Sequence, residues 1–232
     1  MTPGELAALL DCTLLEPGLD DEQVVAGIRT ARRLGIASVT VRPCDIDLVI
    51  RTVQSGAVRP GAVCGFPHGS QNTATKLFEA RDLLRRGARD IAAVIGTSRL
   101  LSREFQHVQT ELLQLAESCH KEGAQFTVIL EPSWLTDELK VIVCACAERA
   151  EADFVCAGTG FAPGWTAEDL RLLRKHLPEE IGLQAMGGIR KLDQVLEVRD
   201  LGCSRISTPD PTAILDEWAA RQAPPTSSPS AV

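Results

Sequence analysis

The stretch FTVILEPSWLTDELKVIVCACAERAEADFVCAGTG, residues 126–160, indicates the architecture of this chain most clearly. Two short runs rich in apolar and β-branched residues, Phe126–Glu131 and Phe154–Ala157, flank the longer segment Thr136–Ala150, which opens on Thr-Asp-Glu. Short apolar runs are typical of buried strands, and a threonine followed by acidic residues is typical of a helix start. The stretch therefore predicts a strand, a helix and a second strand parallel to the first.

The same alternation continues in both directions along the chain. Six further runs are predicted strands: Leu9–Leu15, Ala37–Val41, Ala62–Phe66, Asp90–Ile95, Gly182–Ala185 and Arg205–Thr208. Six more segments are predicted helices: Asp20–Leu34, Thr73–Arg86, Ser102–Glu122, Thr166–His176, Leu192–Leu201 and Thr212–Arg221. Eight strands at intervals of roughly 25–30 residues, separated by helices, predict a parallel sheet that closes into a (β/α)8 TIM barrel.

An open doubly wound sheet is the competing architecture. Such sheets usually carry a glycine-rich phosphate loop after the first strand. Here Leu9–Leu15 leads into Glu16-Pro17-Gly18, which is not such a loop, so the barrel is favoured. A chain of 232 residues suits a single domain. We expect the barrel over residues 1–222 and a disordered tail over the Pro/Ser-rich residues 223–232.

Composition and charge restrict the classes of partner. The net charge of -7 argues against nucleic acid or an anionic membrane surface as the main partner. Apolar runs such as Val141–Ala147 are too short to span a bilayer, and residues 1–11 lack the pattern of a secretion signal. The eight cysteines form no C-x-x-C pair, so we expect them to be reduced and buried. These features predict a cytoplasmic protein. We further expect a small-molecule ligand and no cofactor, and the sequence leaves a homodimer open.

Glycines follow two of the late strands. Thr159-Gly160 follows the sixth predicted strand and Gly187-Gly188 follows the seventh, with Arg190 nearby. Loops after late barrel strands often bind phosphate through backbone N–H groups, which glycine leaves accessible. These four residues are therefore candidate phosphate ligands, and the alternative is that the glycines only make tight turns.

Strand alternation predicts which side chains point into the barrel. Asp11 or Thr13 is expected to point inward from the first strand, and Thr127, Ile129 and Glu131 from the fifth. Asp11 and Glu131 would then approach one cavity, where two carboxylates can divide acid and base roles. The alternative is that Asp11 caps a turn and Glu131 binds loop backbone.

The sixth and seventh strands are expected to place Cys156 and Gln184 in the same lumen. A reactive thiol needs a nearby cation or base, for which His68 is the only obvious candidate, so an inert buried cysteine is the alternative. The scattered spacing of Asp11, His68, Glu131 and Cys156 shows no metal-binding signature. We therefore expect no metal.

Several segments together resemble the deoxyribose-phosphate aldolase family of class I aldolase barrels, from about Leu9 to about Asp210. The resemblance rests on the order and spacing of DCTLL (11–15), GIASV (35–39), PC (43–44), GFPHG (65–69), TK (75–76), FEA (78–80), GA (87–88), VILE (128–131), ADFV (152–155), TGF (159–161) and GGIR (187–190). It implies a (β/α)8 barrel and a carbon–carbon lyase that forms a Schiff base between a lysine and the substrate carbonyl.

The resemblance also implies that the catalytic groups are replaced in this chain. The family's Schiff-base lysine on the sixth strand corresponds to Cys156, and a second lysine on the seventh corresponds to Gln184. The proton-carrying aspartate of the fourth strand corresponds to Ala92, and a further lysine to Thr127. None of the five lysines lies on a predicted strand: Lys76, Lys121, Lys140, Lys175 and Lys191.

Compared with the family it resembles, this chain retains only part of the expected phosphate pocket. After the eighth strand the family reads Gly-Thr/Ala-Ser-Ser, whereas this chain reads Ser207-Thr208-Pro209-Asp210. Proline lacks an N–H donor, and an aspartate near a phosphate would repel it.

Three hypotheses follow. The first is a pseudo-aldolase that binds a small sugar, polyol or sugar phosphate, or has a structural or regulatory role. The second is an enzyme with lysine-independent chemistry that uses Asp11, Glu131 and Cys156. The third is a residual deoxyribose-5-phosphate aldolase.

Overall fold

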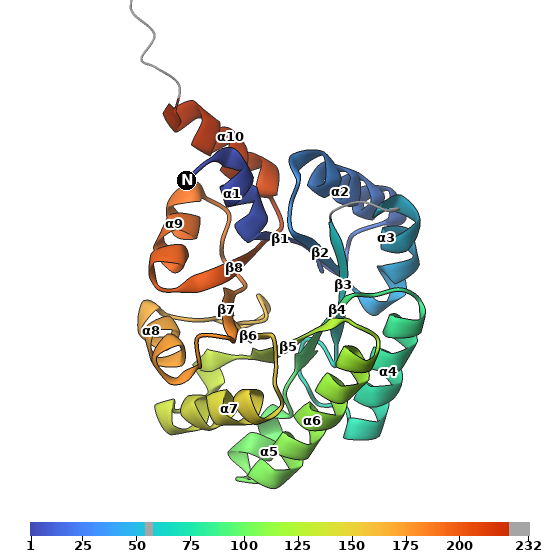
Figure 1. Ribbon diagram of the computed structural model, residues 1–232, viewed down its shortest axis with the longest axis vertical. Coiled ribbons are helices and arrows are strands. Elements are labelled where there is room, and N and C mark those ends of the chain that lie inside the picture. Colours follow the sequence, from blue (N-terminus) through green and yellow to red (C-terminus); the bar gives the residue numbers. More distant parts are fainter. Residues whose placement is uncertain (54–57, 223–232) are drawn as a thin grey trace, which may run out of the picture.

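The computed structural model describes residues 1–53 and 58–222, and the predicted tail 223–232 lies outside the described residues. Eight parallel strands form a closed barrel in which each pairs with the next and β8 pairs with β1 (Figure 1). The strands are β1 (Leu10–Leu14), β2 (Ser38–Val41), β3 (Arg59–Cys64), β4 (Asp90–Val94), β5 (Gln125–Leu130), β6 (Phe154–Ala157), β7 (Gly182–Ala185) and β8 (Cys203–Thr208). The predicted single-domain (β/α)8 barrel is confirmed.

Helices surround the barrel on the outside (Figure 1). They are α1 (Pro3–Leu9), α2 (Asp21–Leu34), α3 (Ile46–Val53), α4 (Thr73–Arg85), α5 (Thr97–Leu101), α6 (Phe105–Lys121), α7 (Asp137–Arg149), α8 (Ala167–His176), α9 (Leu192–Asp200) and α10 (Pro211–Gln222), with short 3-10 turns at Pro43–Asp45 and Pro132–Trp134. Within residues 1–53 and 58–222, no helix is both long enough and apolar enough to cross a bilayer.

Capping side chains explain why several helices begin where the sequence predicts. Asp20, Thr136 and Thr166 are N-cap residues whose side chains accept the backbone N–H three residues later. Such a bond satisfies one of the N–H groups that a helix start leaves unpaired. Each predicted start is therefore one residue before the first helical residue.

Other boundaries differ from the prediction for local reasons. The predicted helix Ser102–Glu122 begins at Phe105, because Arg103 has a φ of 60° and separates α5 from α6. The third strand begins at Arg59 rather than Ala62 and ends before Gly65, whose φ is 63°. Helices α1 and α3 were not predicted, since each is short.

Side chains of the barrel strands divide between two cores. Outward-facing residues such as Leu10, Cys12 and Leu14 pack against the surrounding helices. The inward-facing residues Leu15, Val63, Ala92, Val94, Ile129, Cys156 and Met186 form a separate cluster in the lumen, against which Phe66 packs. This alternation is the period of two expected of a strand, and it fixes which residues can form a site inside the barrel.

Candidate functional site

Asp11 lies at the centre of a polar cluster inside the barrel and is 1% exposed. Its Oδ1 accepts hydrogen bonds from Ser38 Oγ at 2.7 Å and Thr40 Oγ1 at 2.8 Å. Its Oδ2 accepts from Ser207 Oγ at 2.9 Å and Gln184 Nε2 at 3.5 Å. Strand register causes this arrangement, because Asp11 is level with Ser38 on β2 and Ser207 on β8. The side chain is therefore a lumen residue and not a turn cap.

Cys156 lies in the lumen beside Gln184, its register partner on β7. The thiol is fully buried, and its Sγ points to the Gly158 carbonyl at 3.8 Å. Burial raises the pKa of the Cys156 thiol well above its usual range, and the negative charge of Asp11 adds to that shift. His68, the candidate base, lies exposed on the loop after β3. The structure thus places the thiol where it stays protonated.

Glu131 is the first residue after β5 and has no exposed surface. Its Oε2 accepts from the backbone N–H and the Oγ1 of Thr159, both at 3.0 Å, and its Oε1 accepts from Ser133 Oγ at 3.0 Å. The carboxylate thus joins the loop after β5 to the loop after β6. Its hydrogen-bond partners differ from those of Asp11, so the two acids form separate networks, and Glu131 has the loop-binding role that was the alternative.

A cavity of about 180 Å³ opens at the mouth of the barrel. It brings together all four candidate phosphate ligands with residues from the first and last strands. Its lining residues are Thr13, Leu15, Glu16, Thr159, Gly160, Phe161, Met186, Gly187, Gly188, Arg190, Ser207 and Pro209. A second, more open hollow of about 450 Å³ lies on the other side of the loops after β6 and β7 and shares Gly160, Gly187 and Gly188 with the mouth cavity. Other hollows lie on the outer helical surface, for example over α4.

Charge at this mouth is nearly balanced. Arg190 Nη2 lies 3.2 Å from Glu16 Oε1, and both side chains are more than half exposed. Phe161 packs edge-to-face against Phe66, with the ring centroids 5.4 Å apart, on the apolar side of the opening. The cavity thus combines one cation, one anion, backbone N–H groups and an aromatic wall.

The two late-strand glycine loops approach each other closely. Gly187 has a φ of 98°, and a Cβ there would lie 2.8 Å from the Cα of Gly160. Gly188 has a φ of 74° and would meet no atom within 4 Å. The tight-turn alternative therefore accounts for Gly187, whereas Gly188 leaves open space beside its backbone.

Pro209 and Asp210, which follow β8, differ in their relation to the cavity. Pro209 lines the cavity, as its sequence position suggests. Asp210, in contrast, directs Oδ1 to the backbone N–H of Ala213 at 3.1 Å and so caps the start of α10. Its carboxylate is not part of the cavity lining.

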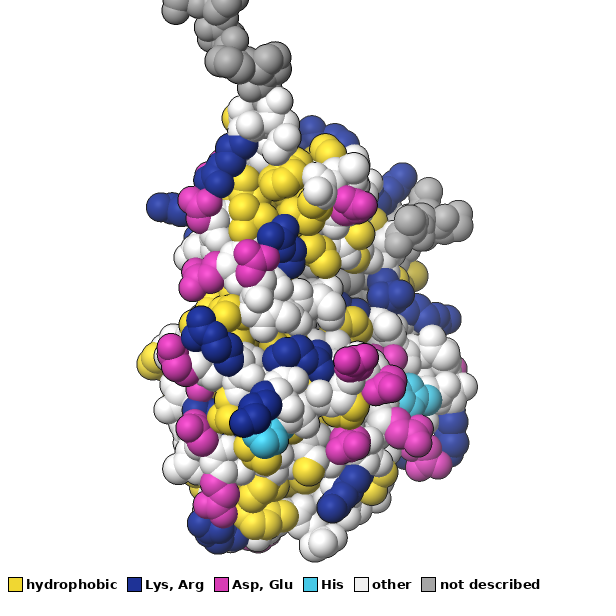
Figure 2. Space-filling view, turned by 60° about the vertical axis from the view of Figure 1, so that its left-hand side comes forward, with side chains coloured by type: hydrophobic (Ala, Val, Ile, Leu, Met, Phe, Trp, Pro, Cys, Tyr) yellow, Lys and Arg dark blue, Asp and Glu magenta, His cyan; other side chains and the backbone are white. Residues whose placement is uncertain are grey.

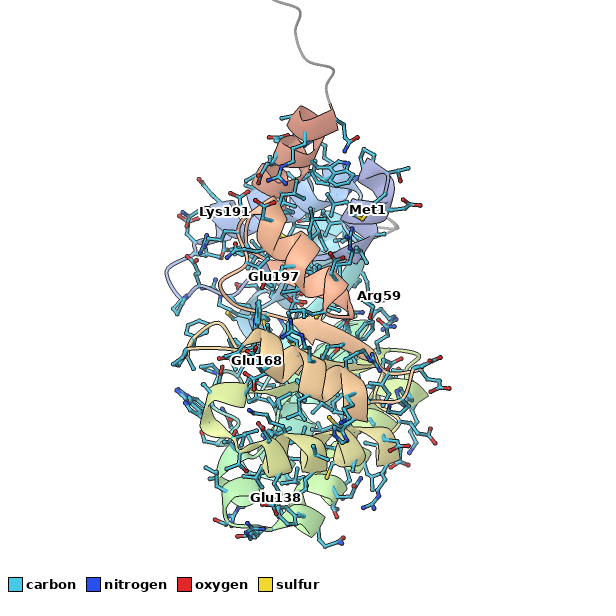
Figure 3. The ribbon with its side chains drawn as sticks, turned by 90° about the vertical axis from the view of Figure 1, so that its left-hand side faces the viewer. Met1, Arg59, Glu138, Glu168, Lys191 and Glu197 are labelled. Atoms are coloured by element: carbon cyan, nitrogen blue, oxygen red, sulfur yellow. The ribbon has the colours of Figure 1, made fainter. Side chains whose placement is uncertain are left out.

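All five lysines lie off the strands. Lys76 is fully buried on α4, where Nζ donates to Glu111 Oε1 and to the Val94 carbonyl oxygen, both at 2.7 Å. Lys140 on α7 pairs with Asp169 at 2.5 Å. The other three are exposed: Lys121, Lys175 and Lys191. Figure 3 shows Lys191 on the outer surface at the start of α9.

The sequence interpretation missed a second polar group at the opposite end of the barrel. Arg205 donates to Asp90 Oδ2 at 2.5 Å and to Gln125 Oε1 at 2.7 Å, and its guanidinium lies 3.7 Å from the centre of the Phe154 ring. These buried groups close the base of the lumen. Counting back by two from Ser207 along β8 would have placed Arg205 inward. Ser38, Thr40 and Ser207 as partners of Asp11 were missed as well.

No three His, Cys, Asp or Glu side chains in the described part of the chain gather in an arrangement that suits a metal ion. The site is thus a polar lumen built around Asp11 that opens into a small mouth cavity between the late-strand loops. A closed barrel with its cavity at the carboxyl ends of the strands defines the class of single-domain (β/α)8 barrels with a small-molecule site.

Comparison with known proteins narrows this class. Deoxyribose-phosphate aldolase of Caldanaerobacter subterraneus is 35% identical over 215 residues, 92% of this chain and 93% of the relative. The enzyme of that name from Thermococcus kodakarensis is 35% identical over 219 residues, 93% of this chain and 98% of the relative. The tetrameric deoxyribose phosphate aldolase of Aeropyrum pernix superposes with a TM-score of 0.87 at 26% identity, covering 95% and 93% of the two chains.

No protein-family profile matches the chain. The identities to full-length relatives nevertheless show that this chain belongs to the deoxyribose-phosphate aldolase family.

Proposed function

We propose that this protein binds a small sugar, polyol or sugar phosphate at the mouth of its barrel and does not perform Schiff-base retro-aldol cleavage. The observation that carries the proposal is the position of the lysines. None lies on a strand, and the two buried ones, Lys76 and Lys140, are held in ion pairs with Glu111 and Asp169.

Schiff-base catalysis needs a primary amine that can lose its proton and attack a carbonyl carbon. At the positions that the family resemblance assigns to the two lysines, the lumen has Cys156 and Gln184. A thiol adds to an aldehyde as a hemithioacetal and cannot form an iminium ion, so it supplies no electron sink. The inward-facing Ala92 has no proton to transfer, although the family resemblance places an aspartate there.

The mouth cavity supports binding of a small anionic or hydroxylated ligand. Thr159, Gly160, Gly187 and Gly188 line it, and the open space beside Gly188 gives a ligand access to the backbone. Arg190 supplies a cation at the rim, which Glu16 partly balances. These four lining residues form our proposed phosphate site. The three glycines would offer backbone N–H groups, whereas Thr159, whose N–H and Oγ1 both donate to Glu131, would hold the loop in position.

The structure offers little support for lysine-independent catalysis. Four hydrogen bonds already occupy the carboxylate of Asp11, and three occupy that of Glu131. Burial keeps the thiol of Cys156 protonated by raising its pKa. None of the three groups is poised as a base or nucleophile.

We also propose a cytoplasmic location and a homodimer. Seven of the eight cysteines are buried as free thiols, which agrees with a reducing compartment. One relative, from Aeropyrum pernix, is described as a tetramer, so self-association has precedent in the family. Sedimentation equilibrium would measure the oligomeric state.

The binding function is tested with 2-deoxyribose 5-phosphate. Isothermal titration calorimetry should detect binding, and a coupled alcohol dehydrogenase assay should detect no release of acetaldehyde. The Thermococcus kodakarensis relative is the positive control. Acetaldehyde release that grows with the concentration of this protein would contradict the loss of activity. A lack of binding to this ligand and to free sugars and polyols would contradict the binding function.

A further inference from the structure

The second hollow beside the loops after β6 and β7, here called the outer hollow, has room for a ring. Its volume is about 450 Å³, whereas a cavity of about 150 Å³ already holds benzene. The segment before α8 and the first turn of α9 form its walls, and Figure 3 shows both helices on the face that it displays. Ala162, Pro163 and Trp165 supply apolar surface, and Gln194 and glycine backbone supply polar groups.

Trp165 is held in place as a wall of the outer hollow. It directly precedes Thr166, the N-cap residue of α8, and its side chain packs partly buried against the main core. Its Cδ1 would lie 3.3 Å from a Cβ at Gly158, so the indole lies against the start of the loop after β6. An aromatic side chain fixed in this way offers a flat ligand ring a contact surface at little cost in its own conformational freedom.

Gln194 adds one oriented donor to the outer hollow. Its Oε1 accepts from the backbone N–H groups of Arg190 at 3.0 Å and Lys191 at 3.1 Å, which fixes the orientation of the amide. Its Nε2 donates one hydrogen to the Gly188 carbonyl oxygen at 2.9 Å. The second hydrogen of Nε2 has no acceptor in the described part of the chain, so it is available to a ligand.

Gly160, Gly187 and Gly188 line both the outer hollow and the mouth cavity. Within residues 1–53 and 58–222, their backbone N–H groups have no hydrogen-bond partner. The two loops touch at Gly160 and Gly187, so only glycine backbone separates the two spaces there. Gly188 is exposed, and a Cβ on it would meet no atom within 4 Å. A phosphate at Gly188 would therefore lie on the edge that the two spaces share, with one ester oxygen directed to each.

Charge at this shared edge suits a ligand with one negative charge. Among the described residues that line the two spaces, the charged ones are Glu16 and Arg190, whose side chains pair at 3.2 Å. A phosphate monoester carries about 1.5 to 2 negative charges at pH 7, whereas a diester lacks the second ionisable oxygen and carries one. The additional charge of a monoester would face Glu16 without a further cation.

We propose that the ligand is a phosphodiester that joins a sugar or polyol to an aromatic ring. The sugar or polyol would lie in the mouth cavity, the phosphate on the N–H groups of the three shared glycines, and the ring in the outer hollow beside Trp165. The inference rests on the proposed binding function and narrows its ligand class.

Three probes that differ only at the phosphate test this assignment: 2-deoxyribose 5-phosphate, its methyl phosphodiester and its phenyl phosphodiester. Isothermal titration calorimetry at pH 7.5 should show the phenyl diester binding about tenfold more tightly than the methyl diester, because only the phenyl ring contacts Trp165. The methyl diester should bind at least as tightly as the monoester, because it places less negative charge beside Glu16. In Trp165→Leu the preference for phenyl over methyl should fall to less than twofold.

Trp134 provides a matched control. It is a second tryptophan with an accessible side chain, but it belongs to the 3-10 turn after β5 and lines neither the outer hollow nor the mouth cavity. Trp134→Leu should keep the full preference for the phenyl diester. The comparison of the three probes on wild-type protein needs no substitution, so it decides the assignment even where Trp165→Leu fails to fold.

Equal affinity of the wild-type protein for the phenyl and methyl diesters, or an undiminished preference in folded Trp165→Leu, would overturn the role of the outer hollow. Tighter binding of the monoester than of the methyl diester would overturn the phosphodiester class. In both cases the proposed binding function stands, because a probe has bound. Failure of the wild-type protein to bind all three probes would overturn the inference and count against the binding function as well, and titration with free sugars and polyols then tests that function separately.

Discussion

Glu131 shows how one buried carboxylate shapes the site by joining two loops. Its three hydrogen bonds hold Thr159, a cavity residue, and Ser133 in place. In Glu131→Gln an amide N–H2 group would face at least one of these donors. We expect the free energy of unfolding in urea to fall by about 1–3 kcal/mol.

Glu138→Gln is the control for this change, because Glu138 pairs with Arg103 on the surface with both side chains more than half exposed. Its stability should match that of the wild-type protein. An equally stable Glu131→Gln variant would show that the loop connection is unimportant.

Thiol reactivity gives a second prediction at the scale of single residues. Only Cys44 among the eight cysteines is exposed. Ellman's reagent should therefore react with one thiol in the folded protein and with all eight in denaturant. Labelling of Cys156 in the folded protein, located by peptide mass analysis, would contradict the protonated, enclosed thiol described above.

At the scale of elements, the loops after β6 and β7 depend on glycine unequally. Gly187→Ala forces a Cβ to within 2.8 Å of the Gly160 backbone at a φ of 98°. Gly188→Ala meets only the cost of a positive φ, about 1 kcal/mol. Thermal unfolding should show a larger loss of melting temperature for Gly187→Ala. Equal losses would mean that the loops separate without penalty.

Lys76 connects α4 to α6 through a buried ion pair with Glu111 and to β4 through a hydrogen bond from Nζ to the Val94 carbonyl oxygen. Lys76→Met leaves the Glu111 carboxylate buried without its cation, and we expect a loss of about 3–5 kcal/mol in the free energy of unfolding. The double variant Lys76→Met with Glu111→Leu should recover part of that loss. A single variant of wild-type stability would show that the pair contributes nothing.

The sequence predicted helices well where an N-cap residue directly precedes the amphipathic pattern of a helix, as at Thr136 and Thr166. It failed where a helix is too short for a full amphipathic period, as in α3, or where one residue with positive φ, Arg103, divides a helical stretch. Alternation correctly placed Asp11, Cys156 and Gln184 in the lumen. It could not show which of them interact, because the partners of Asp11 come from β2, β7 and β8 through register alone.

At the scale of the whole molecule, buried thiols predict a loss of stability in alkali. Burial raises the pKa of Cys12, Cys119, Cys144 and Cys203 from 9.0 to about 12. The unfolded chain then ionises near pH 9 while the folded protein keeps its protons. Stability is therefore fully present below pH 9 and decreases towards pH 12, by up to about 1.4 kcal/mol per pH unit for each thiol.

Urea unfolding at pH 7, 8, 9 and 10 measures this dependence. The free energy should be nearly constant up to pH 8 and fall steeply by pH 10. Cys44→Ser should change this profile little, because the pKa of the exposed Cys44 thiol is raised less than that of the buried thiols. A flat profile to pH 10 would mean that the thiols ionise equally in both states.

At the scale of the whole molecule, Figure 2 shows acidic and basic side chains interspersed with apolar groups on the face it displays. The central claim of the proposed function concerns the barrel mouth: no amine of this protein forms an iminium with a sugar aldehyde there. Incubation with 2-deoxyribose 5-phosphate and borohydride, followed by intact mass and peptide mapping, tests it directly. We predict no adduct, with the Thermococcus kodakarensis relative labelled in parallel. A covalent adduct on any residue inside the barrel would contradict the account.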